Sequence, residues 1–148
     1  MGQGRMSWFV HSQESESIMK TIKVSELSCA ALDWAVAKCE GGEGLWFDTV
    51  STYWVNIDGK ERALSKGWAQ SFTPSTDWAQ GGSIIEREGI NLFLRKGSIA
   101  KAGKPWLAYN DKHVEALGPT LLIAAMHCYV ESKLGDMVEV PEELLKCL

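Results

Sequence analysis

The sequence contains no apolar run long enough to cross a membrane, since a spanning helix needs about 18–20 apolar residues. The segment 1–18 also lacks the continuous apolar stretch of a secretory signal. We therefore expect a protein without membrane association that resides in the cytoplasm.

Closely spaced cysteines are absent too. Cys29, Cys39, Cys128 and Cys147 include no pair at C-x-x-C spacing. Zinc fingers and dithiol redox motifs need closer pairs, so neither kind of site is supported. We expect four reduced cysteines, no metal site and no cofactor.

Positive charge is scarce. Fifteen Lys and Arg residues stand against nineteen Asp and Glu, and only four of the basic residues are arginines. The net charge of −4 disfavours a broad electrostatic grip on phosphate backbones. Seven tryptophans could stack on single-stranded bases, but the accompanying basic groove would rest on Lys96, Lys101 and Lys104. Nucleic acid is therefore not the expected partner, and most of the tryptophans are expected in the core.

Motifs for catalysis are also missing. The glycines of 97–103 do not have the spacing of a phosphate-binding loop, and Pro105 stands where that motif needs Ser or Thr. His127 and Cys128 are adjacent on an expected helix, so their side chains point about 100° apart and cannot form a nucleophile–base pair. We expect the histidines on the surface and assign no catalytic residue. An enzyme assembled from distant loops stays open as an alternative.

What the chain does have is the composition of a folded domain. It has 148 residues, 45% of them hydrophobic and 23% charged, which is typical of globular proteins. Residues 1–18 are polar and serine-rich, and we interpret them as a disordered extension or an over-extended start before Met19. Residues 19–148 contain no linker or repeat, so we expect one domain there.

Periodicity predicts the elements of this domain. Apolar residues at helical spacing indicate one helix ending near Cys39 and another from about Thr120 to Leu134. Asp58-Gly59 is a two-residue turn signal between strands over 53–57 and 60–64. Shorter strands are expected over 90–94, 106–109 and 138–140. The chain is therefore α+β, with a small antiparallel sheet packed with two main helices and one or two short helices.

The segment 74–89 is the candidate binding site. A turn at Pro74–Asp77 precedes a short helix, and Ser83 with Glu86 forms an S-x-x-E capping box at the start of a helix over 84–88. In one interpretation the amides of 81–83 bind an anion, while Trp78 stacks on a base and Arg87 pairs with a phosphate. In the other, the segment is only a turn and a cap, with Trp78 in the core and the glutamates on a solvated face. The candidate residues are Ser75, Thr76, Asp77, Trp78, Gln80, Gly81, Gly82, Ser83, Glu86 and Arg87.

Three segments together resemble a known family: LDWAVAKCEG (32–41), STDWAQGGSIIEREGI (75–90) and GPTLLIAAMHCYV (118–130). They are similar to the NinX-like family of small proteins from phages and prophages, over about residue 19 to the C-terminus. The resemblance implies a phage context and transfers no activity and no catalytic residue. Our first hypothesis is a non-enzymatic phage accessory protein that binds a host or phage protein in the bacterial cytoplasm. The alternative is a small-ligand protein for a nucleotide-like anion, and a homodimer is compatible with either.

Overall fold

The computed structural model describes residues 18–48, 52–96 and 103–146. Except for Ile18, the expected N-terminal extension lies outside these residues, so that expectation remains a prediction. The described elements, in chain order, are β1 (Met19–Lys23), η1 (Val24–Glu26), α2 (Cys29–Cys39), β2 (Glu43–Phe47), β3 (Tyr53–Ile57), β4 (Lys60–Ala63), α3 (Trp78–Glu88), β5 (Asn91–Leu94), β6 (Trp106–Tyr109), β7 (Glu115–Gly118), α4 (Leu121–Leu134), β8 (Met137–Pro141) and η3 (Glu142–Lys146). This arrangement confirms the predicted α+β class.

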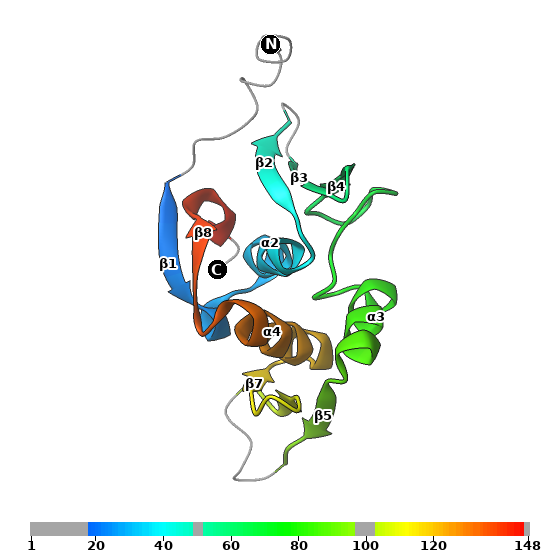
Figure 1. Ribbon diagram of the computed structural model, residues 1–148, viewed down its shortest axis with the longest axis vertical. Helices are drawn as coiled ribbons and strands as arrows, with labels where there is room; N and C mark the ends of the chain where they lie inside the picture. The colour runs from blue at the N-terminus through cyan, green and yellow to red at the C-terminus, as the bar shows by residue number, and fades with distance from the viewer. Residues whose placement is uncertain (1–17, 49–51, 97–102, 147–148) are drawn as a thin grey trace.

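The described strands divide among three small antiparallel sheets instead of forming one. β1 pairs with β8, β2–β3–β4 form a second sheet, and β5–β6–β7 form a third. Figure 1 shows the sheets arranged around α2 and α4, with β5 and β7 at the far end of the molecule from β2. Since two sheets are local hairpin arrays, each needs only short connections, whereas the β1–β8 pair joins the two ends of the described chain.

Helix α4 is the centre of the core. Every residue from Ala124 to Val130 is buried, so the helix is covered on all sides. It packs against α2, α3, β6 and β7. Its N-cap is Thr120, whose hydroxyl accepts a hydrogen bond from the Ile123 amide at 3.1 Å.

The Asp58-Gly59 hairpin is confirmed. Both turn residues have positive φ, 55° and 80°, as a two-residue turn of this kind requires. Asn56 accepts a hydrogen bond from the Gly59 amide at 3.0 Å. The turn therefore fixes the register in which Trp54 pairs with Ala63.

Two expectations about side chains were wrong. Cys29 is disulfide-bonded, while Cys39 and Cys128 are free. Spacing along the chain could not reveal this, because a disulfide depends on which cysteines the fold brings within bonding distance. His127 is buried with only 2% of its surface exposed, and not on the surface. In the described part of the chain, no helix has both the length and the apolar character needed to cross a bilayer.

Candidate functional site

The candidate segment 75–87 folds differently from its prediction. A single helix, α3, runs from Trp78 to Glu88, and its N-cap is Asp77, whose carboxylate accepts from the Ala79 amide at 2.9 Å. The predicted capping box is wrong: Ser83 lies inside the helix and donates its hydroxyl to the Ala79 carbonyl. Asp77 stands directly after the turn at Thr73–Thr76, so the helix starts at the earlier cap.

The glycines of this segment serve close packing. A Cβ at Gly81 would lie 2.4 Å from the Pro74 carbonyl oxygen and 2.6 Å from a methyl group of Leu122. The Gly81 amide donates to the Asp77 carbonyl at 2.8 Å. Because Gly81, Gly82 and Ser83 lie within the helix, their amides point along its axis and do not converge on a ligand.

A buried carboxylate holds the turn before α3. Asp33 of α2 is 3% exposed and accepts a hydrogen bond from the Ser75 amide at 2.9 Å. Burial raises the pKa of the Asp33 carboxyl to about 7, against the opposing effects of the Ser75 hydrogen bonds and of Lys66. This contact joins two of the segments that carry the family resemblance, and sequence reasoning missed it because Asp33 falls among apolar residues of a helix.

Trp78 is exposed, whereas the interpretation of this segment as a turn and a cap placed it in the core. Its side chain is 59% exposed at the start of α3 and does not enter the core. Gln80 lies beside it in the chain and turns back to the preceding residues, donating to the Asp77 carboxylate at 2.9 Å and accepting from the Thr73 amide at 2.8 Å. The N-terminal half of the candidate segment is therefore a self-paired polar turn with one exposed indole.

Arg87 lies at the other end of α3, away from this turn. It binds Glu40, the C-cap of α2, through the two terminal guanidinium nitrogens, at 3.2 and 2.6 Å, and binds Glu88 through Nε at 2.9 Å. Its guanidinium also contacts the Tyr129 ring and hydroxyl of α4, and Tyr129 donates to Glu40. Lys133 adds an ion pair to Glu88 at 3.9 Å. The guanidinium expected to pair with a phosphate is thus held by two carboxylates.

The pKa shifts in this cluster show that its charged groups stabilise the contact between the helices. Burial acts to raise the pKa of Glu40, but the hydrogen bonds from Arg87 and Tyr129 outweigh it and lower the pKa. Burial, followed by the hydrogen bond to Glu40, raises the pKa of Tyr129 above its usual range. Burial, together with Glu40, raises the pKa of the Cys39 thiol to about 12. Neither the phenol nor the thiol is activated as a nucleophile.

The buried side chain of His127 joins two separate segments of the backbone. Its two ring nitrogens meet backbone carbonyls, of Leu117 on β7 at 3.2 Å and of Leu27 after η1 at 2.8 Å. Burial lowers the pKa of His127, although both carbonyls oppose this effect. The imidazole is enclosed by the backbone groups that it joins, so it has no path to a substrate.

Three tryptophans gather on the β2–β3–β4 sheet and its following loop. Trp46 stacks on Trp54 with ring centroids 5.7 Å apart, and Trp68 meets Trp54 edge-on at 5.3 Å. The indole nitrogens of Trp54 and Trp46 donate to Asp48 and Glu61, at 2.8 and 2.7 Å. Because the polar groups of this surface are carboxylates, it is poorly suited to a phosphate-bearing ligand.

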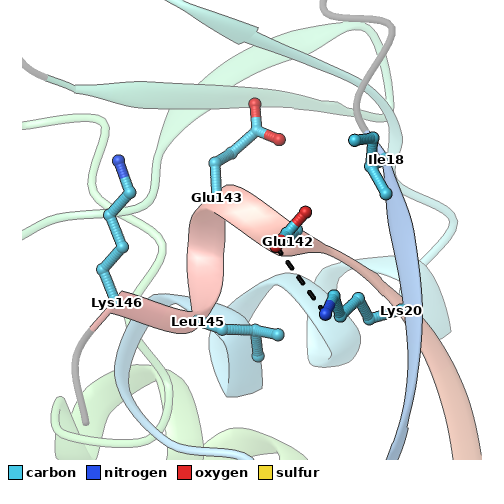
Figure 2. Close-up of a pocket in the computed structure, with 6 residues that line it drawn as sticks. All are labelled: Ile18, Lys20, Glu142, Glu143, Leu145 and Lys146. Atoms are coloured by element: carbon cyan, nitrogen blue, oxygen red, sulfur yellow. Dashed lines mark ion pairs between the residues drawn. The ribbon is translucent and has the colours of Figure 1, made fainter.

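A surface hollow of about 540 Å³ lies between β1 and η3. Figure 2 shows the lining side chains around the turn of η3, where Lys20 and Glu142 form an ion pair at 3.7 Å. The lining residues are Ile18, Lys20, Glu142, Glu143, Leu145 and Lys146. Charges of both signs are mixed here, so the hollow does not select a ligand of one charge. Among the described residues, no three His, Cys, Asp or Glu side chains gather where they could hold a metal ion.

The largest exposed apolar side chains of one sheet lie on β5 and β6. Phe93 is 55% exposed and Tyr109 41%. Phe93 pairs with Leu107, which pairs with Leu117, so these three side chains form a row across the sheet. The other face of the sheet carries buried Ala108 and packs on α4. We call Phe93, Leu107, Tyr109 and Leu117 the outer face; by the same register, Asn91 and Glu115 lie on this side of the sheet beside Tyr109. The apolar residues of β5 and β6 could have revealed this face in the sequence.

Comparison with known families gives the context of these features. Residues 23–133 match the family model described as Bacteriophage P22, NinX. The chain belongs to the NinX family of phage proteins. No curated protein sequence matches it. The match contains both the Asp33–Ser75 contact and the outer face, so each is part of the NinX region of the chain.

Proposed function

We propose that this NinX protein is a non-enzymatic phage accessory protein that acts in the cytoplasm of the bacterial host by binding a host or phage protein. The observation that carries the proposal is the outer face of the β5–β6–β7 sheet. A small domain gains solubility by covering such a row of apolar side chains, and a contiguous exposed apolar patch is typical of a protein–protein contact.

The other polar clusters support a binding role over a catalytic one. The carboxylates and the guanidinium of the Glu40–Arg87–Tyr129 cluster are engaged with one another and join three helices. His127 and Asp33 are buried and bound to backbone groups. A catalytic acid or base must reach a reacting atom, whereas Glu40 and Arg87 are paired with each other and His127 and Asp33 are shielded from solvent.

The test is site-specific photo-crosslinking with benzoyl-phenylalanine in place of Phe93, in the bacterial host. Phe47 provides a matched control because it is also an exposed phenylalanine, at 41%, and lies on a different sheet. We expect a discrete adduct from position 93 and none from position 47. Phe93→Ser should then weaken binding of the identified partner at least thirtyfold, the loss of about 2 kcal/mol that a central aromatic anchor supplies. Equal adducts at both positions, or turnover of a defined substrate with no adduct at 93, would contradict the proposal.

A second candidate is binding of a nucleotide-like anion at the start of α3, and the exposure of Trp78 favours it. Isothermal titration with ATP and ADP tests it. Under this alternative Trp78→Ala abolishes the heat of binding, whereas Arg87→Ala, at the other end of α3, leaves it unchanged. An unchanged heat of binding in the Trp78 variant would contradict the alternative.

A further inference from the structure

The β5–β6–β7 sheet has two edges, and they differ. The Arg95 amide donates to the Pro105 carbonyl at 2.8 Å, which continues the β5–β6 pairing. In an antiparallel ladder the backbone groups of alternate residues face the partner strand. Asn91 and Phe93 therefore direct their backbone groups toward β6, whereas Leu92 and Leu94 direct theirs away from the sheet.

The same alternation explains the opposite edge. Leu117 of β7 directs its carbonyl away from β6, and that carbonyl is met by the imidazole of His127 on α4. The β7 edge is therefore covered by α4. The β5 edge has no such cover: within the described residues, no hydrogen bond reaches the outward backbone groups of Leu92 or Leu94. Figure 1 shows β5 on the side of this sheet away from β7, at the rim of the molecule.

The open edge is also apolar. Phe93 is 55% exposed and Leu94 41%, so the strand presents unsatisfied backbone groups between two exposed hydrophobic side chains. β5 is short, at four residues, but it carries no proline, no bulge and no inward-pointing charge, which are features that protect sheet edges. Such an edge is suited to the addition of another extended strand.

The charges beside β5 indicate which kind of strand would bind at this edge. No Asp or Glu occurs between Glu88 and Asp111, although acidic residues outnumber basic ones in the whole chain by nineteen to fifteen. Arg95 and Lys96 follow β5 directly, and Lys104 precedes β6. None of these three side chains forms an ion pair with a described residue. Two copies of this end of the sheet would repel each other, whereas an acidic segment would be attracted.

We propose that an extended acidic peptide segment of the partner adds to the sheet as a strand beside β5. Its backbone pairs with the outward N–H and C=O groups of Leu92 and Leu94, its apolar side chains pack beside Phe93 and Leu94, and its carboxylates lie against Arg95 and Lys96. The backbone pairing gives affinity, and the charges select the acidic segment. This inference rests on the proposed function and names the partner's chemistry.

The first test uses a nine-residue peptide that alternates Glu with Val, and a second peptide with Lys in place of Glu. We expect the acidic peptide to bind at low ionic strength at least tenfold more tightly than the basic one. Amide hydrogen exchange by NMR should slow at Leu92 and Leu94 when the acidic peptide is added. The amides of Asn91 and Phe93, which already face β6, should not change.

Variants separate backbone pairing from side-chain contact. Leu94→Pro removes the outward donor and leaves the bonds to β6 intact, because proline is tolerated where its nitrogen faces away from the sheet. We expect it to weaken peptide binding at least tenfold, while Leu94→Ala, which keeps the donor, weakens binding less than threefold. Lys96→Glu should lower affinity severalfold, and Lys60→Glu, the same charge change at the distant hairpin, should not. If Leu94→Pro does not fold, amide exchange at Leu92 and Leu94 in the unaltered chain still tests whether the peptide pairs with β5.

Each contrary result overturns the proposal in a recognisable way. Binding of a thymidine oligonucleotide without protection of Leu92 and Leu94 would assign the basic end to nucleic acid. A dimer in native mass spectrometry of the free protein, with Leu94 protected in a concentration-dependent manner, would assign the edge to a second copy. Failure of both peptides beside a positive crosslink at Phe93 would leave the proposed function standing and restrict the contact to the outer face.

Discussion

Asp33 offers the sharpest test of how this structure is held together, through the variant Asp33→Asn. The carboxyl is 3% exposed and its pKa rises from 3.8 to about 7 because of burial. A carboxyl whose pKa is higher in the folded chain than in the unfolded chain stabilises the fold below its unfolded pKa. That stability is lost as the pH rises through the folded pKa. The pH range over which Asp33 makes the stability depend on pH therefore runs from about pH 4 to about pH 7.

The magnitude follows from the shift. Each pKa unit corresponds to about 1.4 kcal/mol, so a shift of this size is worth roughly 4 kcal/mol across this whole pH range. Between pH 5 and pH 8 alone, ionisation of Asp33 should lower the free energy of unfolding by roughly 3 kcal/mol. Asparagine keeps an oxygen for the Ser75 amide and cannot ionise, so the variant loses this dependence.

The assay is urea denaturation followed by tryptophan fluorescence, for both proteins at pH 5 and pH 8. Other titrating groups cancel when the two proteins are compared at each pH. We expect Asp33→Asn to gain roughly 3 kcal/mol relative to the unaltered chain on going from pH 5 to pH 8. Asp111→Asn, at an exposed carboxyl, serves as the control for the chemical change. A difference between variant and unaltered chain that is the same at both pH values would refute the reasoning.

Three further predictions concern packing and polar ties. Gly81→Ala should lower the free energy of unfolding, measured by urea denaturation, by roughly 1–3 kcal/mol through overpacking. In the same assay Gly82→Ala should raise it by up to about 1 kcal/mol, because the nearest atom to the added Cβ would be 3.7 Å away. Arg87→Ala should lower the free energy of unfolding by roughly 1–2 kcal/mol, and by less at high salt. Arg87→Lys should not restore this stability, because lysine cannot bind Glu40 through two nitrogens. An equal loss at all salt concentrations would show that packing, not charge, dominates. His127→Leu removes the one N–H of the neutral imidazole, so a buried backbone carbonyl loses its donor, and the free energy of unfolding should fall by roughly 1–3 kcal/mol in thermal unfolding. An unchanged stability would mean that water replaces the imidazole.

Local signals in the sequence were enough for the long helices and the Asp58-Gly59 hairpin. These elements are set by periodicity, by caps and by turn residues that need positive φ. Strand β7 was missed because its residues are chosen for tertiary contact: a Cβ at Gly118 would lie 2.6 Å from the backbone nitrogen of Ala124. Small residues that let a strand approach a helix carry little strand signal of their own.

The candidate site shows the same limit. The segment 75–87 was recognisable as distinctive, but its chemistry depends on partners far along the chain. Glu40 neutralises Arg87 and Asp33 holds Ser75, and no spacing within the segment reveals either contact. The outer face and the open β5 edge depend on which strands pair and which edge α4 covers, and that is a property of the whole fold.

The complete burial of Ala124–Val130 has a consequence for how the molecule comes apart. The three sheets share no hydrogen-bonded strand, so nothing in their ladders couples one sheet to another. Coupling instead runs through the core that α4 fills, and a sheet cannot leave α4 without exposing apolar surface on the helix. The amides of α4 should therefore exchange with solvent only when the whole domain unfolds, while an edge strand such as β5 can fray and re-form without disturbing the rest.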